Sequence, residues 1–174
     1  MLDHAIDAVQ AVGCERVVVV VGTHSPEVGR AAAARLGPEA VAVQDPPLGT
    51  AHAVLAAQGA LAAFEGDVLV TNADCPLLRG DDLQPLVDAR AGGAALALLG
   101  FEPGDAALYG RLLTDGTGRV TRIVEARDAS PDELAVRQCY AGMLAADRAR
   151  LFGWLKRVGN ENAKREYYLT DIVG

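Results

Sequence analysis

Hydrophobic runs and helical stretches alternate along the first 100 residues of the chain. Residues 16–21 form a continuous, mostly β-branched run that ends at Gly22, which is typical of a strand buried on both faces. A Ser-Pro-Glu sequence at residues 25–27 then predicts a helix start, with serine as N-cap and proline in the first turn. This alternation predicts an open, mostly parallel α/β sheet. The further expected elements are strands at 40–43, 67–71 and 94–100 and helices at 25–36, 50–64 and 81–90.

The pattern changes after residue 100. Short strands are predicted at 111–114 and 119–124, and the Asp-Gly-Thr-Gly sequence between them has turn chemistry, so they are expected to form a hairpin. Residues 137–145 predict another strand, and residues 148–158 predict a helix. No internal repeat or linker is evident, so we expect residues 1–174 to form a single domain in which the hairpin elaborates the same sheet.

Composition limits the classes of partner. The net charge of −7 argues against nucleic acid, because affinity for a phosphate backbone comes from clustered Lys and Arg. The 3 cysteines are scattered without a CxxC pair, so neither a disulfide framework nor a zinc site is expected. No signal peptide and no apolar run of roughly 18 residues is evident, which predicts a cytoplasmic protein without a membrane partner.

Asp74 follows the predicted strand at residues 67–71 and is therefore expected at the carboxyl edge of the sheet. Open α/β sheets bind their ligands at this edge. A carboxylate there commonly holds Mg²⁺, which takes a few oxygen ligands together with substrate phosphates. The alternative is that Asp74 only caps the turn before Pro76. Together with the neighbouring motifs, the metal site is favoured.

The sequence Leu48-Gly49-Thr50 opens the predicted helix at residues 50–64. Thr50 is expected to cap the free backbone N–H groups of the helix, and Gly49 allows a close backbone approach. A helix start also attracts anions. Gln44 adds an amide that can pair with a nucleobase edge, although each of these features alone is compatible with an ordinary helix entry.

Gly110 lies just before the predicted hairpin, and Glu125 ends its second strand. A glycine N–H together with a carboxylate that accepts hydroxyl donors suits a sugar ring, whereas the alternative for Glu125 is a solvated hairpin end. The three histidines show no partner arrangement, and no role is assigned to them: His4, His24 and His52.

The order and spacing of five sequence blocks are recognisable: QDPPLGTAHA, NADCPL, YGRLL, RIVEARDAS and NENAKREYYLTDIV. Together they resemble the uridyltransferase (pyrophosphorylase) domain of bifunctional N-acetylglucosamine-1-phosphate uridyltransferase / glucosamine-1-phosphate acetyltransferase. The resemblance covers essentially the whole chain and implies a Rossmann-like nucleotide-diphospho-sugar transferase fold. It also implies an enzyme that makes UDP-N-acetylglucosamine and pyrophosphate from UTP and N-acetylglucosamine 1-phosphate, for peptidoglycan and lipopolysaccharide precursors.

The resemblance also implies roles for individual residues. Gln44, Gly49 and Thr50 match positions that hold the uracil, and Asp74 matches the Mg²⁺ ligand. The implied reaction is an in-line attack of the sugar phosphate on the α-phosphorus of UTP, in which positioning and charge neutralisation supply most of the acceleration. The positions expected at the sugar are Gly110, Glu125, Tyr140, Glu166, Tyr168 and Thr170.

The chain departs from the family pattern at several points. Tyr140 stands where the family has an Asn that bonds the sugar, and Asn72-Ala73 replaces the usual Tyr-Gly before the metal ligand. The family begins with a strand and a Gly-rich loop whose Arg and Lys grip the triphosphate, but residues 1–4 match the helix after that loop. The chain also stops before the segment with a second Mg²⁺ ligand and before the acetyltransferase domain.

These departures lead to two further expectations. With the first strand of the sheet missing, the strand at residues 16–21 is expected to expose an unpaired edge and to promote self-association. Without the basic loop, a non-catalytic nucleotide or sugar-phosphate binding module is an alternative to the enzyme. A third alternative, which Tyr140 favours, is a nucleotidyltransferase for a different acceptor.

Overall fold

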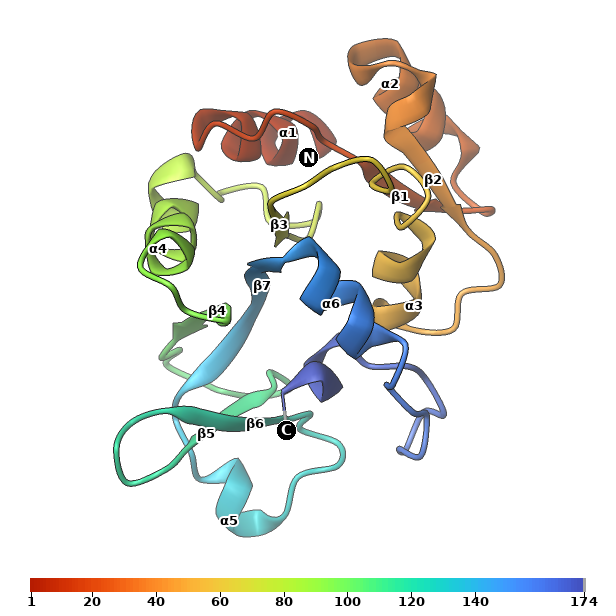
Figure 1. The fold of residues 1–174 in the computed structure, drawn as a ribbon. Helices are drawn as coiled ribbons and strands as arrows, with labels where there is room; N and C mark the ends of the chain where they lie inside the picture. Colours follow the sequence, from red (N-terminus) through yellow and green to blue (C-terminus); the bar gives the residue numbers. More distant parts are fainter. Residues whose placement is uncertain (174) are drawn as a thin grey trace.

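The computed structural model describes residues 1–173, and its strands form two separate sheets (Figure 1). The strands are β1 (Val19–Gly22), β2 (Val41–Gln44), β3 (Asp67–Val70), β4 (Leu96–Phe101), β5 (Arg111–Thr114), β6 (Val120–Val124) and β7 (Cys139–Asp147). The α-helices are α1 (Leu2–Ala11), α2 (Pro26–Leu36), α3 (Thr50–Ala56), α4 (Gly80–Ala91), α5 (Pro131–Leu134) and α6 (Arg148–Leu155). Short 3-10 turns form η1 (Pro38–Ala40) and η2 (Leu169–Ile172).

Strand β7 organises the larger sheet. It lies between β3 and β4 and is antiparallel to both, with Leu144 opposite Val70 on one side and Leu98 on the other. Strands β3 and β4 therefore run parallel to each other without touching edges. The β5–β6 hairpin joins the same sheet where Arg111 faces Cys139.

The smaller sheet consists of β1 and β2, which form the only directly parallel pair among the described residues. The predicted α/β alternation and hairpin are confirmed, but parallel pairing is less extensive than predicted. The reason is that β7 is buried on both faces, so its sequence is as continuously apolar as that of a parallel strand and does not reveal its direction.

Helices cover both faces of these strands, as Figure 1 shows. On one face, Val9 of α1 packs with Leu83 of α4 in a buried cluster that includes Met143 of β7. On the other face, Ala51 of α3 packs with Leu151 of α6 in a second cluster. None of the helices in the described part of the chain is long and apolar enough to cross a bilayer.

Several boundaries differ from the sequence-based prediction. Helix α3 ends at Ala56 rather than near residue 64, because the chain continues in turns that include Gly59. Strand β1 begins at Val19 rather than at residue 16. Helix α5 was not predicted, although its capping box is visible in the sequence: the side chain of Ser130 accepts from the N–H of Glu133, whose carboxylate accepts from the N–H of Ser130.

Candidate functional site

The loop between β2 and α3 is closed by the side chain of Gln44. Its Nε2 donates to the carbonyl of Gly49 at 2.9 Å and lies 3.1 Å from Nδ1 of His52. The structure thus brings together Gln44 and Gly49, two of the positions that the resemblance assigns to the uracil. It also places His52, to which no role was assigned, against the same amide.

Gly49 and Thr50 connect this loop to the last segment of the chain. Gly49 has a φ of +117°, and a Cβ at this position would lie 2.5 Å from the carbonyl oxygen of Tyr167. The prediction that Thr50 caps α3 is wrong, because Gly49 occupies the N-cap position. The Thr50 hydroxyl instead accepts from the N–H of Leu169 at 2.8 Å, a contact between residues 119 positions apart that no local pattern reveals.

Gly110, Glu125, Tyr140 and Thr170 lie together where β5, β6 and β7 meet η2. The Thr170 hydroxyl donates to Oε1 of Glu125 at 3.1 Å, and the N–H of Tyr140 donates to the carbonyl of Gly110 at 2.8 Å. A Cβ on Gly110 would lie 3.7 Å from Oε2 of Glu125. Glu125 is therefore not the solvated hairpin end that was the alternative for it.

The carboxyl of Glu125 is partly withdrawn from water. Burial raises its pKa above the ordinary value of 4.5, while the Thr170 hydrogen bond and the charge of Lys164 act in the opposite direction. A carboxyl of this kind accepts hydrogen bonds from hydroxyl groups in a site that excludes much of the solvent. This chemistry suits a polyhydroxylated ligand.

Tyr140 fills space next to Glu125. Its side chain packs with Leu112 and Ile123, and the residue is only 8% exposed. Among the described residues its buried hydroxyl has no hydrogen-bond partner. Burial, with a smaller contribution from the Glu125 charge, raises the pKa of Tyr140 far above that of a free phenol. The phenol is therefore a neutral donor left unused beside a carboxylate.

The segment that carries Glu166 and Tyr168 is fixed by its own hydrogen bonds. Asn162 Nδ2 donates to the carbonyl of Glu166 at 2.6 Å, and Asp128 accepts from the N–H of Ala163 at 2.9 Å. Tyr168 is buried. Since η2 follows directly and contacts both Thr50 and Glu125, this segment joins the predicted nucleotide positions to the predicted sugar positions.

Asp74 lies exposed on the turn that follows β3. Its only hydrogen bond within residues 1–173 comes from Sγ of Cys75 at 3.8 Å, so nothing in this part of the chain supports the alternative role as a turn cap. The preceding Asn72 packs against Gly142 of β7, which has a φ of +82°. The turn with Asp74 therefore lies toward the end of β7 that carries Tyr140.

The donor set at Asp74 fits Mg²⁺ only as part of a complex with substrate. Nowhere in the described chain do three or more His, Cys, Asp or Glu side chains form a metal cluster. Mg²⁺ commonly binds through one or two carboxylates and completes its octahedral shell with waters and substrate phosphates. A single exposed carboxylate is sufficient for such a shared site.

Arg111 is a buried site residue that sequence reasoning missed. It is 3% exposed, and its guanidinium donates to the carbonyls of Ala106 at 3.3 Å and Leu134 at 3.4 Å, and also to that of Tyr109. These bonds hold the loop that leads into Gly110. The signal was present in the YGRLL block, where an arginine directly follows that glycine.

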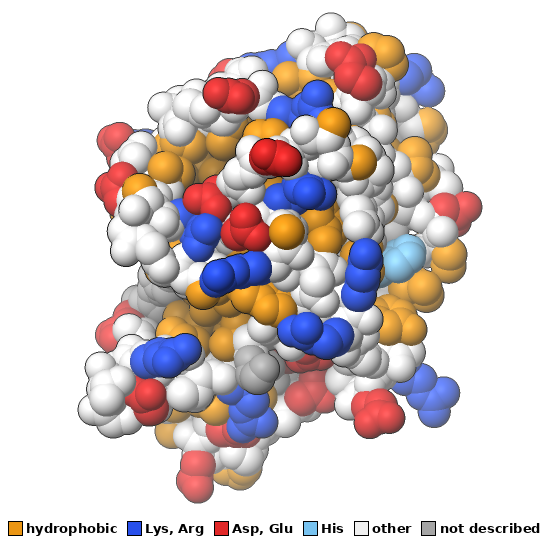
Figure 2. All heavy atoms as spheres, in the orientation of Figure 1, with side chains coloured by type: hydrophobic (Ala, Val, Ile, Leu, Met, Phe, Trp, Pro, Cys, Tyr) orange, Lys and Arg blue, Asp and Glu red, His pale blue; other side chains and the backbone are white. Residues whose placement is uncertain are grey.

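Charges are mixed on the face of the molecule seen in Figure 2. Lys and Arg side chains are spread among Asp and Glu side chains and do not gather in one stripe. Single-signed basic stripes are the usual footprint of nucleic-acid binding. The expectation of no nucleic-acid partner rests on the net charge of −7.

Residues 1–130 match one protein family, described as the MobA-like NTP transferase domain. The chain belongs to this family. It is 55% identical over 174 residues to the bifunctional protein GlmU of Caulobacter vibrioides, and 52% identical over 177 residues to GlmU of Aromatoleum aromaticum. Each alignment covers 100% of the chain, which spans only 38% and 37%, respectively, of the length of these relatives.

Solved structures of nucleotidyltransferases share the fold of this NTP transferase domain. A UDP-glucose pyrophosphorylase in complex with UDP-glucose superposes with a TM-score of 0.73 over 97% of the chain and 71% of its own length, at 14% identity. A putative glucose-1-phosphate thymidylyltransferase from Bacillus anthracis gives a TM-score of 0.71 over 98% of the chain and 67% of its own, at 17% identity. The predicted family and the Rossmann-like fold are confirmed.

Proposed function

We propose that the chain carries a uridyltransferase site that forms UDP-N-acetylglucosamine and pyrophosphate from UTP and N-acetylglucosamine 1-phosphate. One observation carries the proposal. Through Leu169 and Thr170, the η2 turn contacts Thr50 and Glu125 at once, so that two motifs far apart in the sequence belong to one connected site. Identity above 50% to GlmU proteins supports the choice of uridyl and N-acetylglucosamine groups.

In this proposal the uracil lies against the loop before α3. Gln44 fixes the loop, and Thr50 fixes the start of α3. Gly49 allows the backbone to approach Tyr167, just before η2. These contacts give a rigid edge for base recognition. The sugar lies against Glu125, whose carboxylate accepts from its hydroxyl groups, with the N–H of Gly110 nearby.

Residues just before η2 and on β7 complete the proposed sugar site. Glu166 and Tyr168 belong to the segment that closes beside Thr170. Tyr140 lies beside Glu125 and shapes the acceptor pocket. Orientation of the sugar phosphate in line with the α-phosphorus supplies much of the rate, since little covalent chemistry is asked of the protein.

Asp74 is the proposed Mg²⁺ ligand. When bound there, Mg²⁺ neutralises charge on the phosphate oxygens of both substrates. The role of Asp74 is to fix the position of that charge at the edge of the sheet. This also accounts for the binding of two polyanions by a chain with a net charge of −7.

Pyrophosphate release from UTP, N-acetylglucosamine 1-phosphate and Mg²⁺ tests the proposal on residues 1–174. We expect Mg²⁺-dependent release, with a loss of at least about 100-fold in Asp74→Asn because a metal-bound charge is lost. Glu65→Gln is the matched control, since Glu65 is exposed at the opposite end of β3, and it should retain activity. Uridine-nucleotide binding without turnover would instead support the binding-module alternative, and neither binding nor turnover would contradict both.

A different acceptor is the second candidate, and the position of Tyr140 favours it. The phenol occupies volume beside Glu125 where a smaller residue would leave room for an N-acetyl group. Turnover with N-acetylglucosamine 1-phosphate, glucosamine 1-phosphate and glucose 1-phosphate separates the candidates. A higher kcat/KM for an acceptor without the acetyl group, reversed in Tyr140→Asn, would replace the first proposal by the second.

A further inference from the structure

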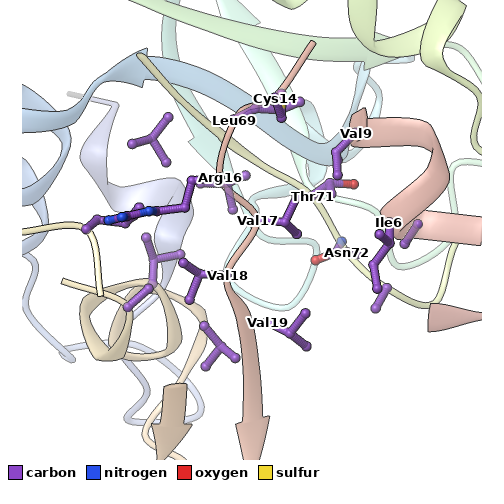
Figure 3. Close-up of a pocket in the computed structure, with 18 of the residues that line it drawn as sticks. Ile6, Val9, Cys14, Arg16, Val17, Val18, Val19, Leu69, Thr71 and Asn72 are labelled. Atoms are coloured by element: carbon purple, nitrogen blue, oxygen red, sulfur yellow. The ribbon is translucent and has the colours of Figure 1, made fainter. Parts of the chain in front are cut away.

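Arg16 and Arg111 both direct their guanidinium groups at backbone carbonyls, but their surroundings differ. Figure 3 shows Arg16 beside Val17 and Val18, extending away from the segment that carries them. It is exposed and donates to one carbonyl, that of Ala60, at 2.9 Å. Arg111 is 3% exposed, and the acceptors of its hydrogen bonds are four backbone carbonyls. The charge of Arg111 is therefore solvated by the polypeptide that surrounds it and hardly by water.

The guanidinium of Arg111 closes the loop between β4 and β5. Its Nη1 donates to the carbonyl of Ala106 at 3.3 Å and to that of Tyr109, and its Nη2 donates to the carbonyl of Ala107 at 3.4 Å. Ala107 has a φ of +32°, which a residue other than glycine adopts only where the surrounding structure holds it. Hydrogen bonds from a charged donor are stronger than those between neutral groups, so Arg111 determines the shape of this loop.

The hydrogen bond from Arg111 to Tyr109 determines where the next backbone N–H points. The carbonyl of Tyr109 and the N–H of Gly110 belong to one peptide unit, which is trans and planar. Because C=O and N–H point in opposite directions in such a unit, a carbonyl held by Arg111 aims the N–H of Gly110 away from the guanidinium. The positive charge on the carbonyl also polarises the unit and makes the N–H a stronger donor.

The N–H of Gly110 is available for a ligand. Gly110 is buried, and among the described residues its N–H has no acceptor, whereas its carbonyl accepts from the N–H of Tyr140 at 2.8 Å. A buried N–H without a partner costs free energy, which an acceptor on a ligand would recover. A Cβ on Gly110 would lie 3.7 Å from Oε2 of Glu125, so a carboxylate acceptor lies near this donor. A donor beside an acceptor is complementary to the oxygen-bearing groups of a sugar.

We propose that Arg111 is a positioning residue for the sugar: it holds the Tyr109 carbonyl so that the N–H of Gly110 donates to an oxygen of the sugar beside Glu125. This inference rests on the proposed function, which places the sugar there. Arg111 acts through the peptide unit and does not touch the substrate, because its hydrogen bonds are all directed at carbonyls.

The alternative is that Arg111 only anchors α5. Its Nε donates to the carbonyl of Leu134, the last residue of α5, at 3.4 Å. The exposed Arg122 of β6 also holds α5, through an ion pair with Glu133, and its hydrogen bond goes to that carboxylate and not to the loop before β5. Arg122→Met therefore loosens α5 without releasing Tyr109, which makes it the matched control.

Binding of UDP-N-acetylglucosamine and of UDP, each without pyrophosphate, tests the inference in the absence of turnover. The amide signal of Gly110 is followed by NMR, and the two dissociation constants are measured by calorimetry. In the wild type we expect UDP-N-acetylglucosamine, but not UDP, to move the Gly110 amide proton downfield, as a new hydrogen bond requires. In Arg111→Lys and Arg111→Met this shift should be lost, and the dissociation constant should rise at least tenfold for UDP-N-acetylglucosamine and less than twofold for UDP. Arg122→Met should behave as the wild type.

The lysine variant keeps the test decisive if the methionine variant does not fold. Lysine retains the positive charge, but its ammonium is a point charge that cannot reach four carbonyls at once. An unchanged Gly110 shift in Arg111→Lys, or equal losses for UDP and UDP-N-acetylglucosamine, would overturn the inference and leave the proposed function standing. Losses in Arg122→Met as large as those in Arg111→Lys would overturn it in favour of the anchoring role. If the wild type bound both nucleotides equally and showed no shift at Gly110, the proposed sugar site would fail and the inference with it.

Discussion

The hydroxyl of Thr170 donates to Oε1 of Glu125 at 3.1 Å, across 45 positions of sequence. Thr170 is 5% exposed, and Glu125 is half-buried at the end of β6. Because the neighbouring Leu169 bonds to Thr50, this contact is one half of a bridge between the hairpin and α3. The pKa of Glu125 therefore reports whether the hairpin, η2 and α3 are packed together.

Thr170→Val should raise the pKa of Glu125 further, because it removes a hydrogen bond that favours the charged form. The carboxylate at Glu125 would lose a partner in a partly buried position, so the free energy of unfolding should fall by about 1–2 kcal/mol. NMR titration of the Glu125 carboxyl carbon and urea denaturation measure the two effects. Thr114→Val, at the exposed end of β5, is the control and should change stability by less than about 0.5 kcal/mol.

Glu125 should also give the stability of the protein a specific pH dependence. Because its pKa in the folded state lies above the ordinary 4.5, the folded protein binds this proton more tightly than the unfolded chain does. The contribution of Glu125 to the free energy of unfolding is therefore largest at acid pH, and it declines as pH rises from about 4.5 through the folded pKa. Glu125→Gln, which does not titrate, should gain stability relative to the wild type over that window. Parallel stability profiles of the two proteins between pH 4 and 8 would contradict this assignment.

Tyr140→Phe should stabilise the fold. The variant removes a buried hydroxyl that has no partner among residues 1–173 and retains the ring that packs with Leu112 and Ile123. We expect a gain of about 1 kcal/mol in the free energy of unfolding, measured by urea denaturation. Tyr109→Phe, at a position 48% exposed, should show no such gain. A loss of stability in Tyr140→Phe would mean that the hydroxyl has a partner in solution.

Gly49→Ala should separate the start of α3 from Tyr167, just before η2. A Cβ would meet the Tyr167 carbonyl at 2.5 Å, and the φ of +117° is one that alanine rarely adopts. The expected cost is at least about 2 kcal/mol, together with weaker uridine-nucleotide binding in the same preparation. Gly59→Ala is the matched control, since a Cβ there meets nothing within 4 Å, and near-equal effects of the two changes would sink the argument.

Local sequence patterns were sufficient for most elements of the fold. The continuous apolar run before Gly22 and the turn sequence between β5 and β6 each led to a strand or hairpin that the structure contains. The direction of β7 could not be predicted, because a strand buried on both faces has the same composition in either direction. An unpaired strand edge was expected at residues 16–21, and among the described residues β3 has one as well.

In the candidate site, too, local contacts could be anticipated from the sequence and long-range contacts could not. Gln44 and Gly49 are close in sequence and are joined by a hydrogen bond, whereas the Thr50 hydroxyl was assigned to a cap and instead binds η2. A long-range partner competes successfully with a local one, and nothing in the local pattern reveals it. Arg111 was missed for a similar reason, because only the folded loop shows how many carbonyls converge on it.

The central position of β7 has a consequence for synthesis on the ribosome. Residues 139–147 supply the hydrogen-bonding edge for both β3 and β4, which are translated long before them. Until β7 emerges, the apolar edges of β3 and β4 remain open, and such unpaired edges are where nascent chains aggregate or recruit chaperones. The matched family region ends at residue 130, so a polypeptide stopped there would lack the strand that closes its larger sheet. The nascent chain is therefore most prone to aggregate in the interval between the synthesis of β4 and that of β7, when β3 and β4 both lack their pairing partner.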